Sequence, residues 1–439
     1  MSKNKAKSTK TQRSIHIPIL ARVEGEASLS LVLNNQGIES LQLQIYEPPR
    51  LFEKFLEGRS HREIVDLVAR ICGICPVAYQ MTAAQALENC LGINISPWIR
   101  AMRRVFYCGE WIESHSLHVH CLAAPDFLGF HSVTDMAKVY PEIVRRGIRL
   151  QALGNRLIAF LGGRSVHPVG ACVGGFYKAP HPKEVGAMLV ELQDCLEECD
   201  ALLRWVVTLP FSHINQSFTC VAMRHPQEYP MNEGRISADN GLDIDSVAYE
   251  QYFQEHQVPY SNALHCLLNG KSYLVGPLAR LNLNYQHIPL SIRDVLAEAG
   301  INFPSYNMDH SMVARAVEIY YCVLEAKRLL ENYVYSDQPC LTTVTPRAGV
   351  GFACTEAPRG LLWQSYTLDE TGRVAQVKIV PPTSQNQARI EEELRQTLLS
   401  YGLSNSDEAL RFLSEQRIRN YDPCISCATH FLKLNIVRT

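Results

Sequence analysis

Apolar and polar residues alternate near the start of the chain, and longer periods follow. The stretch ASLSLVLNNQGIESLQLQIYE (27–47) alternates on both sides of Asn34–Gly37, which predicts two strands joined by a turn. A second hairpin is expected over 361–381, with its turn at Asp369–Arg373. The segment 210–310 shows no sustained period, so we expect it to be irregular.

Most of the remaining chain has the spacing and boundary residues of helices. Pro76 and Gly92 bound one helix, and Ser96 and Pro97 supply the cap and first residue of the next. Further helices are expected over 134–161, 183–209, 311–333 and 387–419. The fold class predicted is therefore α+β, a mainly helical body with small β-sheets.

Composition narrows the functional classes. The 439 residues are 46% hydrophobic, and the net charge of -2 does not suggest nucleic-acid binding. No run of 18 apolar residues occurs, so no membrane span is expected. Residues 1–14 read as a disordered basic tail without the apolar run of a signal peptide, so we expect a cytoplasmic protein.

Two pairs of cysteines stand out among the 15 in the chain. Cys72 and Cys75 precede a predicted helix, and Cys424 and Cys427 repeat the same spacing near the other end. Sulfur ligands at this spacing can bind one metal from a single turn, and a helix N-terminus favours their thiolates. The pairs are 424 − 75 = 349 positions apart, so only the whole fold can join them.

Spacing alone leaves three interpretations of these pairs. A structural zinc site with four cysteines is the simplest. A thioredoxin-like redox pair lacks the expected βαβ context. A catalytic nickel or iron site with soft ligands is the third. The long separation favours a buried central site over a local zinc staple, which usually closes a short loop.

Further motifs accompany the cysteines, and together they resemble the large, catalytic subunit of nickel–iron hydrogenases. The motifs, which occur in the order typical of that family, are RVEGE (22–26), PPRLFEKFLEGR (48–59), RICGIC (70–75), EAPRG (356–360), PPTSQN (381–386) and DPCISCATH (422–430). The sequences of these motifs are most similar to those of the cytoplasmic NAD(P)-linked group, which includes the sulfhydrogenases. The resemblance implies that family's large-subunit fold, with 15–430 as a single domain.

The resemblance also implies a cofactor and a reaction. The family interconverts H2 with two protons and two electrons at a nickel held by four thiolates, beside an iron that carries CO and cyanide. By their positions in the motifs, Cys72 and Cys424 would bind nickel alone, whereas Cys75 and Cys427 would bridge nickel and iron. Thiolates are soft donors that suit this metal.

Four further residues match positions around that centre. By resemblance, Glu24 is the expected proton-transfer residue, and Arg359 is the expected cation over the metals. Without the motifs, Glu24 would be interpreted as a surface glutamate. Arg359 would then be interpreted as forming a surface ion pair with Glu356. Pro358 is expected to fix the local backbone, and Thr383 to offer a hydrogen bond to an iron-bound cyanide.

A second metal and a processing site are implied as well. Glu53 and His430 match the ligands of a second, structural metal, magnesium or iron. His430 also marks the position at which a maturation protease cuts in this family after nickel-insertion factors have loaded the metal. Residues 431–439 would then be a cleaved tail.

The sequence departs from the family pattern at two places. Tyr79 stands where many relatives have a histidine, and Ser114 where many have an aspartate that holds the arginine over the metals. We therefore expect Asp422 to take over as the partner of Arg359. By resemblance, His167 would face the nearest iron–sulfur cluster of a partner subunit, and His115, His118 and His120 are read as packing and hydrogen-bonding residues.

Electron transfer requires other chains. No further cysteine group has ferredoxin-like spacing, and no glycine-rich dinucleotide fingerprint is present. We expect a small subunit with iron–sulfur clusters and further subunits that bind FAD and NAD(P). The competing interpretations are a non-catalytic H2-sensing hydrogenase, a zinc-stapled structural subunit, and a respiratory-complex-like subunit, whose family has lost these cysteines.

Overall fold

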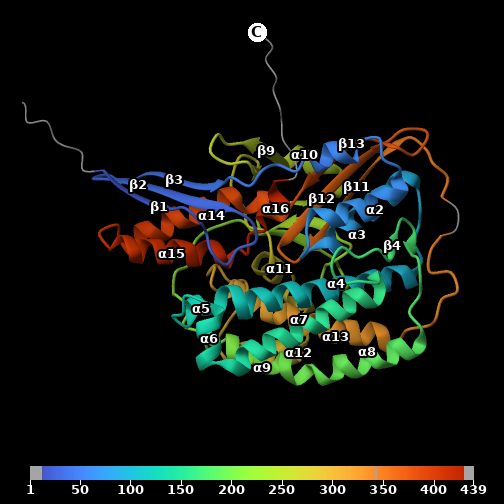
Figure 1. Ribbon diagram of the computed structural model, residues 1–439, viewed down its shortest axis with the longest axis horizontal. Helices are drawn as coiled ribbons and strands as arrows, with labels where there is room; N and C mark the ends of the chain where they lie inside the picture. The colour runs from blue at the N-terminus through green and yellow to red at the C-terminus, as the bar shows by residue number, and fades with distance from the viewer. Residues whose placement is uncertain (1–11, 342–343, 430–439) are drawn as a thin grey trace, which may run out of the picture.

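The computed structural model describes residues 12–341 and 344–429. Long helices form one side of the molecule and small antiparallel sheets the other (Figure 1), so the predicted α+β class is confirmed. The helical side contains α4 (Pro97–Leu117), α7 (Pro141–Gly162), α8 (Pro182–Asp194), α9 (Leu196–Val206), α12 (Leu290–Glu298) and α13 (His310–Glu331). No helix within the described residues is both long and apolar enough to cross a bilayer.

Helix α4 begins as its sequence predicts and is held very close to α7. The Ser96 hydroxyl accepts a hydrogen bond from the backbone N–H of Ile99, and Pro97 is the first helical residue. A Cβ on Gly154 of α7 would lie 2.4 Å from the backbone nitrogen of Glu113 and 2.6 Å from the carbonyl oxygen of Gly109. Only glycine permits this approach, which fixes the position of α4 beneath the site described below.

The N-terminal sheet packs against two C-terminal helices. Its antiparallel strands are β1 (Arg13–Ile17), β2 (Ala27–Asn34) and β3 (Gly37–Ile45), and the predicted hairpin is β2–β3. Buried residues of this sheet share a core with α14 (Pro382–Tyr401) and α15 (Asp407–Asn420). Strand β1 starts inside the range 1–14 that was read as a tail, because Arg13 donates to the carbonyl oxygens of Leu403 and Asn405.

The second three-stranded sheet consists of β11 (Gly349–Ala357), β12 (Gly360–Leu368) and β13 (Val374–Val380). The hairpin predicted at 361–381 is β12–β13 and is confirmed. Strand β11 adds a second hairpin, in which Ala357 pairs with Gly360. Pro358 and Arg359 therefore form a two-residue turn at its tip, on the side where the cysteine pairs lie.

Several long elements are broken where the sequence suggested continuous helices. Helix 134–161 is divided by Pro141 into α6 (Val133–Val139) and α7, because proline lacks the N–H needed inside a helix. Helix 183–209 is divided at Cys195 into α8 and α9, and helix 387–419 is divided at Gly402 into α14 and α15. Helix α14 also begins earlier than expected, at Pro382.

The prediction that 210–310 is irregular was wrong. This segment contains short strands in which buried and exposed positions do not alternate, so no two-residue period marks them in the sequence. They are β6 (Val221–Arg224), β7 (Arg235–Ala238), β8 (Asp243–Ile244), β9 (Phe253–Gln257) and β10 (Leu264–Leu268). The helices of this segment are α10 (Tyr249–Tyr252), α11 (Pro277–Asn284) and α12.

The remaining elements lie between these parts. They are α1 (Phe52–Leu56), α2 (His61–Val68), α3 (Pro76–Leu91), α5 (Ala124–Phe127), α16 (Ile425–Ala428), β4 (Ala171–Cys172) and β5 (Gly175–Phe176). Helix α3 ends at Gly92 in a left-handed conformation, as its sequence predicts. A turn of π-helix, His118–Ala123, continues α4.

Candidate metal centre

The two cysteine pairs meet at the border between the two main cores. The four cysteines belong to the core of the long helices, whereas Ile425 and Ala428 beside them belong to the core of the N-terminal sheet. Each pair lies at the start of a helix: Cys75 is the N-cap of α3, Cys424 is the N-cap of α16, and Cys427 lies within α16. The prediction that the first pair sits at the start of a helix is confirmed.

The four sulfur atoms form one compact group. Sγ of Cys72 lies 3.5 Å from Sγ of Cys424, and Sγ of Cys75 lies 3.5 Å from Sγ of Cys427. The sulfurs of Cys424 and Cys427 are 2.7 Å apart, and all four atoms lie within 4.8 Å of one another. Within residues 12–341 and 344–429, no other group of three or more His, Cys, Asp or Glu side chains is close enough to share an ion.

The four cysteine side chains are buried, and burial disfavours their ionised form unless a cation is present. All four side chains are at most 3% exposed. Burial raises the pKa of Cys75 and of Cys427 well above the ordinary value. Burial opposes ionisation of Cys72 too, but hydrogen bonds from the other three thiols outweigh it and lower the pKa. Four soft donors in this geometry fit a thiolate-bound metal, whose positive charge would offset theirs.

The RVEGE segment is joined to the second cysteine pair through its backbone. Glu24 and Cys424 form a parallel β-bridge, and the backbone N–H of Ile425 donates to the carbonyl oxygen of Glu24 at 3.0 Å. Asp422 adopts a left-handed conformation just before Pro423, with φ of 54°. The chain turns there and delivers Cys424 to the first pair.

The Glu24 carboxylate points at the cluster. The Cys424 thiol donates to Oε2 of Glu24 at 3.1 Å, and the backbone N–H of Ser426 donates to the same oxygen at 3.0 Å. The Ser426 hydroxyl donates to Oε1. Burial, together with the negative charge of Cys424, raises the pKa of Glu24 to about 7. A carboxyl group with that pKa can accept or release a proton near neutral pH.

Arg359 reaches the cluster from the turn between β11 and β12. Its Nε donates to the carbonyl oxygen of Asp422 at 2.7 Å, and one Nη donates to the Asp422 carboxylate at 3.1 Å. Asp422 is thus its partner, as the sequence led us to expect, and the surface pair with Glu356 does not form. The other Nη is buried and has no hydrogen-bond partner among residues 12–341 and 344–429.

Thr383 and Pro358, the residues expected to bind the cofactor, lie next to Cys424 and Arg359 respectively. Thr383, in the first turn of α14, accepts a hydrogen bond from the backbone N–H of Cys424 at 3.0 Å. Pro358 is buried beside Arg359, and its carbonyl oxygen accepts from Arg280 at 2.8 Å. Both residues therefore contact the segments that carry the cysteines or Arg359.

Of the two expected second-metal residues, Glu53 is within the described chain. Oε1 of Glu53 accepts a hydrogen bond from the backbone N–H of Ile379 at 2.8 Å. His430 is outside the described residues. Its neighbour Thr429 is described, and its carbonyl oxygen accepts from the backbone N–H of Arg50 at 2.8 Å. The backbone beside His430 is thereby brought to the segment that holds Glu53.

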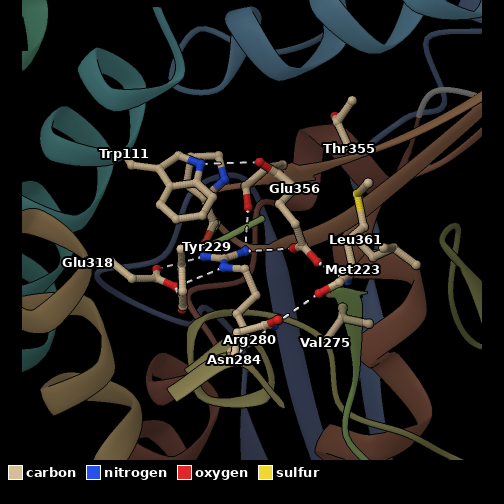
Figure 2. Close-up of polar contacts among 12 residues, drawn as sticks. Trp111, Met223, Tyr229, Val275, Arg280, Asn284, Glu318, Thr355, Glu356 and Leu361 are labelled. Atoms are coloured by element: carbon tan, nitrogen blue, oxygen red, sulfur yellow. Dashed lines mark hydrogen bonds and ion pairs between the residues drawn. The ribbon is translucent and has the colours of Figure 1, made fainter. Parts of the chain in front are cut away.

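Sequence reasoning did not single out Arg280, which bonds to the turn that carries Arg359 and lies between Glu318, Glu356 and Trp111 (Figure 2). Its guanidinium pairs with the carboxylates of Glu318 (2.8 Å) and Glu356 (2.9 Å) and lies 4.2 Å from the ring centroid of Trp111. It also donates to the carbonyl oxygens of Ala357 and Pro358. Arg280 occurs in PLARLNLN, a helical stretch without any motif, so no sequence signal could have identified it.

Sequence reasoning also missed Glu110 of α4, which binds the start of α3. The backbone N–H groups of Val77 and Ala78 donate to its carboxylate at 2.6 and 3.1 Å. A carboxylate at a helix N-terminus satisfies free donors and complements the helix dipole. Glu110 thus fixes the start of α3, the helix that Cys75 caps.

The two departures from the family pattern both lie in the interior. The hydroxyl groups of Tyr79 and Ser114 are buried and have no hydrogen-bond partner within the described part of the chain. Burial and the nearby thiols raise the pKa of Tyr79, so its hydroxyl is a donor and not a base.

The histidines expected to pack or to hydrogen-bond do so. His115 contacts the Glu318 carboxylate at 2.8 Å, and His118 contacts the carbonyl oxygen of Arg419 at 2.7 Å. His120 stacks on Trp205. His167 contacts the carbonyl oxygen of Ala69 at 2.7 Å, three residues before Cys72.

Comparison with known proteins identifies the family. The family model of nickel-dependent hydrogenases matches residues 50–143 and 227–430. The chain is similar to sulfhydrogenase 1 subunit alpha of Pyrococcus furiosus, with 30% identity over 96% of this chain and 100% of that protein. It is also similar to the NAD-reducing hydrogenase HoxS subunit beta of Cupriavidus necator, with 26% identity over 96% of this chain and 95% of that protein.

A solved structure has the same architecture. The crystal structure of an NAD+-reducing [NiFe]-hydrogenase in the H2-reduced state superposes with a TM-score of 0.85 and 27% identity, covering 95% of this chain and 99% of that one. The family match, the full-length relative and this fold agree with the position of the four cysteines. The chain therefore belongs to the nickel-dependent hydrogenases, as a nickel–iron large subunit.

Proposed function

We propose that this subunit interconverts H2 with protons and electrons and exchanges those electrons with NAD(P) through partner subunits. The observation that carries the hydrogenase part is the group of four buried cysteine sulfurs within 4.8 Å. The NAD(P) part is supported by relatives, because one is a sulfhydrogenase alpha subunit and another belongs to an NAD-reducing hydrogenase.

The four cysteines would hold the nickel–iron group. Cys72, Cys75, Cys424 and Cys427 would share this group, whose iron would carry CO and cyanide ligands. When bound, this group supplies the chemistry that converts H2 to protons and electrons. The closeness of the four sulfurs, all within 4.8 Å of one another, supports a shared metal, because a cation among them would offset the charge of four buried thiolates.

Glu24 would move protons between this site and the exterior. Its Oε2 already accepts from the Cys424 thiol, so a proton can pass from sulfur to carboxylate without any rearrangement of the chain. Glu24 is half-buried, whereas Cys424 is fully buried. The carboxylate thus lies on the side of the cluster nearer to solvent.

Arg359 would supply a fixed positive charge beside the metals. Asp422 orients it through two hydrogen bonds and leaves one Nη available. Pro358 would set the turn that presents Arg359, and Thr383 would orient a cyanide ligand while it holds the backbone of Cys424.

Glu53 and His430 would hold a second metal, magnesium or iron. The hydrogen bond from Arg50 to the carbonyl oxygen of Thr429 supports this proposal, since it joins the two segments concerned. We further propose that a maturation protease, acting after nickel-insertion factors, removes 431–439.

The partners would carry the electrons. The proposal includes a small subunit with iron–sulfur clusters near His167 and subunits with FAD, iron–sulfur clusters and an NAD(P) site. It rests on the relatives, which are subunits of multisubunit hydrogenases, and on the position of His167, which contacts the backbone three residues before Cys72.

Metal analysis and infrared spectroscopy of the purified complex test the proposal. We expect about one nickel per chain and sharp bands from CO and cyanide. Zinc with no such bands would contradict it and favour a structural four-cysteine site.

Assays with H2 and either NAD+ or NADP+ test the electron acceptor. Reduction of an artificial dye without reduction of either nucleotide would contradict the NAD(P) part alone. A metal-loaded complex that turns over far more slowly than about 1 per second would favour an H2 sensor.

A further inference from the structure

Two other cysteines, far apart in the sequence, lie in contact near the surface. Cys172 ends β4 and Cys340 lies in the segment before β11, 340 − 172 = 168 positions later. Their Sγ atoms are 3.1 Å apart. Neither residue takes part in the site described above.

The backbone holds these two cysteines together. The carbonyl oxygen of Pro339 accepts from the N–H of Phe176 at 2.9 Å, and the N–H of Leu341 donates to the carbonyl oxygen of Gly174 at 3.1 Å. A Cβ on Gly175 would lie 2.1 Å from the carbonyl oxygen of Pro339, so only glycine allows this contact. Both neighbours of Cys340 are therefore bound to the β4–β5 hairpin.

A buried ion pair supports the hairpin from beneath. The carboxylate of Glu88 accepts from the backbone N–H of Gly174 at 2.6 Å and pairs with Arg103 at 2.5 Å. Both charged side chains are 3% exposed. The sulfur–sulfur contact is thus a feature of a fixed framework and not of one loose loop.

Small molecules can reach this pair. Cys340 is partly exposed, and both cysteines line a cavity of about 200 Å³ that opens to solvent. Its lining also includes Tyr177 and His61. No third metal-ligating side chain among the described residues is close enough to share an ion with these two, because such groups occur there only at the four-cysteine cluster. Two thiols without a third ligand suit disulfide chemistry better than metal binding.

We propose that Cys172 and Cys340 form a redox-active dithiol, which low-molecular-weight disulfides oxidise to an internal disulfide. The Cys340 thiolate attacks one sulfur of the small disulfide, forms a mixed disulfide and releases one thiolate. Cys172 then loses its proton and attacks Sγ of Cys340, releasing the second thiolate. The net step converts two protein thiols and one small disulfide into a protein disulfide and two small thiols.

The surroundings favour Cys340 as the attacking residue. The hydrogen bond with Cys172 lowers the pKa of Cys340 to about 7 and raises that of Cys172. Cys340 is also the more exposed of the two. The charged or titratable groups that face it from neighbouring elements are Cys172, Arg103, Glu88, His61, Arg62 and Tyr177.

Oxidised glutathione on the complete complex tests the proposal. After treatment, remaining thiols are alkylated and peptides are analysed by mass spectrometry. We expect a Cys172–Cys340 cross-linked peptide that dithiothreitol cleaves, while the partly exposed Cys121 stays fully alkylated as an internal control. Separate alkylation of both cysteines after treatment would overturn the proposal, whether partner subunits cover the pair or not.

Single variants test the order of attack. With Cys172→Ser we expect a stable glutathione adduct on Cys340, and with Cys340→Ser at least tenfold less adduct on Cys172. In the wild-type complex, alkylation of Cys340 should be half-maximal near pH 7, below the value of about 8.5 for an ordinary thiol. Equal adducts in the two variants would overturn the assignment of Cys340 as nucleophile.

Discussion

Arg280 and Arg359 are both buried and both hold the same β11–β12 turn, yet their surroundings differ. Arg280 has two carboxylates, two carbonyl oxygens and the face of Trp111, so its donors are used. Arg359 has only Asp422 and keeps one Nη without a partner among residues 12–341 and 344–429. The protein supplies partners for all the donors of Arg280, whereas Arg359 keeps one donor without a partner in the described structure.

The difference separates a structural role from a functional one. A buried arginine is stable only when its charge and donors are compensated. Arg280 meets that condition within the chain. For Arg359 the remaining compensation comes from the thiols, since the charges of Cys424, Cys75 and Cys72 add to that of Asp422 in raising its pKa despite burial. We therefore propose that the free Nη of Arg359, which lies beside the four cysteines, faces the side of the cluster where a reacting group would bind.

The largest expected effect is on stability, from Arg280→Met. Removing the cation leaves the carboxylates of Glu318 and Glu356 buried without it, which should lower the free energy of unfolding by about 3–5 kcal/mol. Thermal unfolding of the complex measures this loss. Arg104→Met is the matched control, because Arg104 is equally buried and paired with Glu325 but has no contact with the β11–β12 turn.

Both variants should lose stability, but only Arg280→Met should also shift the infrared bands of the metal site, since the turn that carries Arg359 moves. Identical spectra in the two variants would show that Arg280 does not position Arg359.

Arg359→Lys should reduce activity and leave stability nearly unchanged, which is the opposite of the effect expected for Arg280→Met. A lysine cannot make the two hydrogen bonds to Asp422 in the same geometry, so H2 oxidation should fall by about 100- to 1000-fold. Nickel content and melting temperature should stay close to those of the wild type. Dye-linked H2 uptake on metal-loaded protein is the measurement. A large loss of stability with little loss of activity would reverse the roles of the two arginines.

Glu24→Gln tests the proton side of the site. The amide keeps the size of the side chain but cannot accept a proton from Cys424, so turnover should fall by about 100-fold. Glu26→Gln is the matched control, because Glu26 is exposed and two residues away. Turnover under H2 and the infrared spectrum should be recorded together. Unchanged turnover in Glu24→Gln would exclude it as the proton carrier.

Tyr79→Phe should have the smallest effect. The hydroxyl is buried without a partner in the described structure, so its removal leaves no protein group unsatisfied, and stability should change by less than about 1 kcal/mol. A loss of activity above tenfold on metal-loaded protein would show that the hydroxyl donates to a bound ligand. Tyr107→Phe, whose hydroxyl is also buried, is a suitable comparison.

Local patterns predicted the elements that bring the motifs together. Ser96, Pro97 and Gly92 gave the ends of two helices correctly, because caps and stops depend on neighbouring residues. The turn at Asp369–Arg373 was equally local. The cysteine motifs predicted a single cluster, and the structure brings all four sulfurs together.

What escaped prediction depends on contacts between distant segments. Arg280 gains its role from Glu318 and Glu356, which are 38 and 76 positions away, and no local pattern records that encounter. The strands between 210 and 310 are buried on both faces or irregularly, so their sequences show no alternation. The contact between Cys172 and Cys340 could not be predicted from their spacing, because two cysteines 168 positions apart meet only in the complete fold.

The separation of the two cysteine pairs has a consequence in time. The ribosome must add 349 residues between Cys75 and Cys424, which at about 5–20 residues per second takes roughly 17–70 seconds. During that interval the first two thiols exist without the other two, while much of the chain that later encloses them is still unmade. A metal delivered then would meet half a ligand set. Under the proposed function, a complete ligand set would therefore exist only after Cys424 and Cys427 have been synthesised, and metal loading would follow that point.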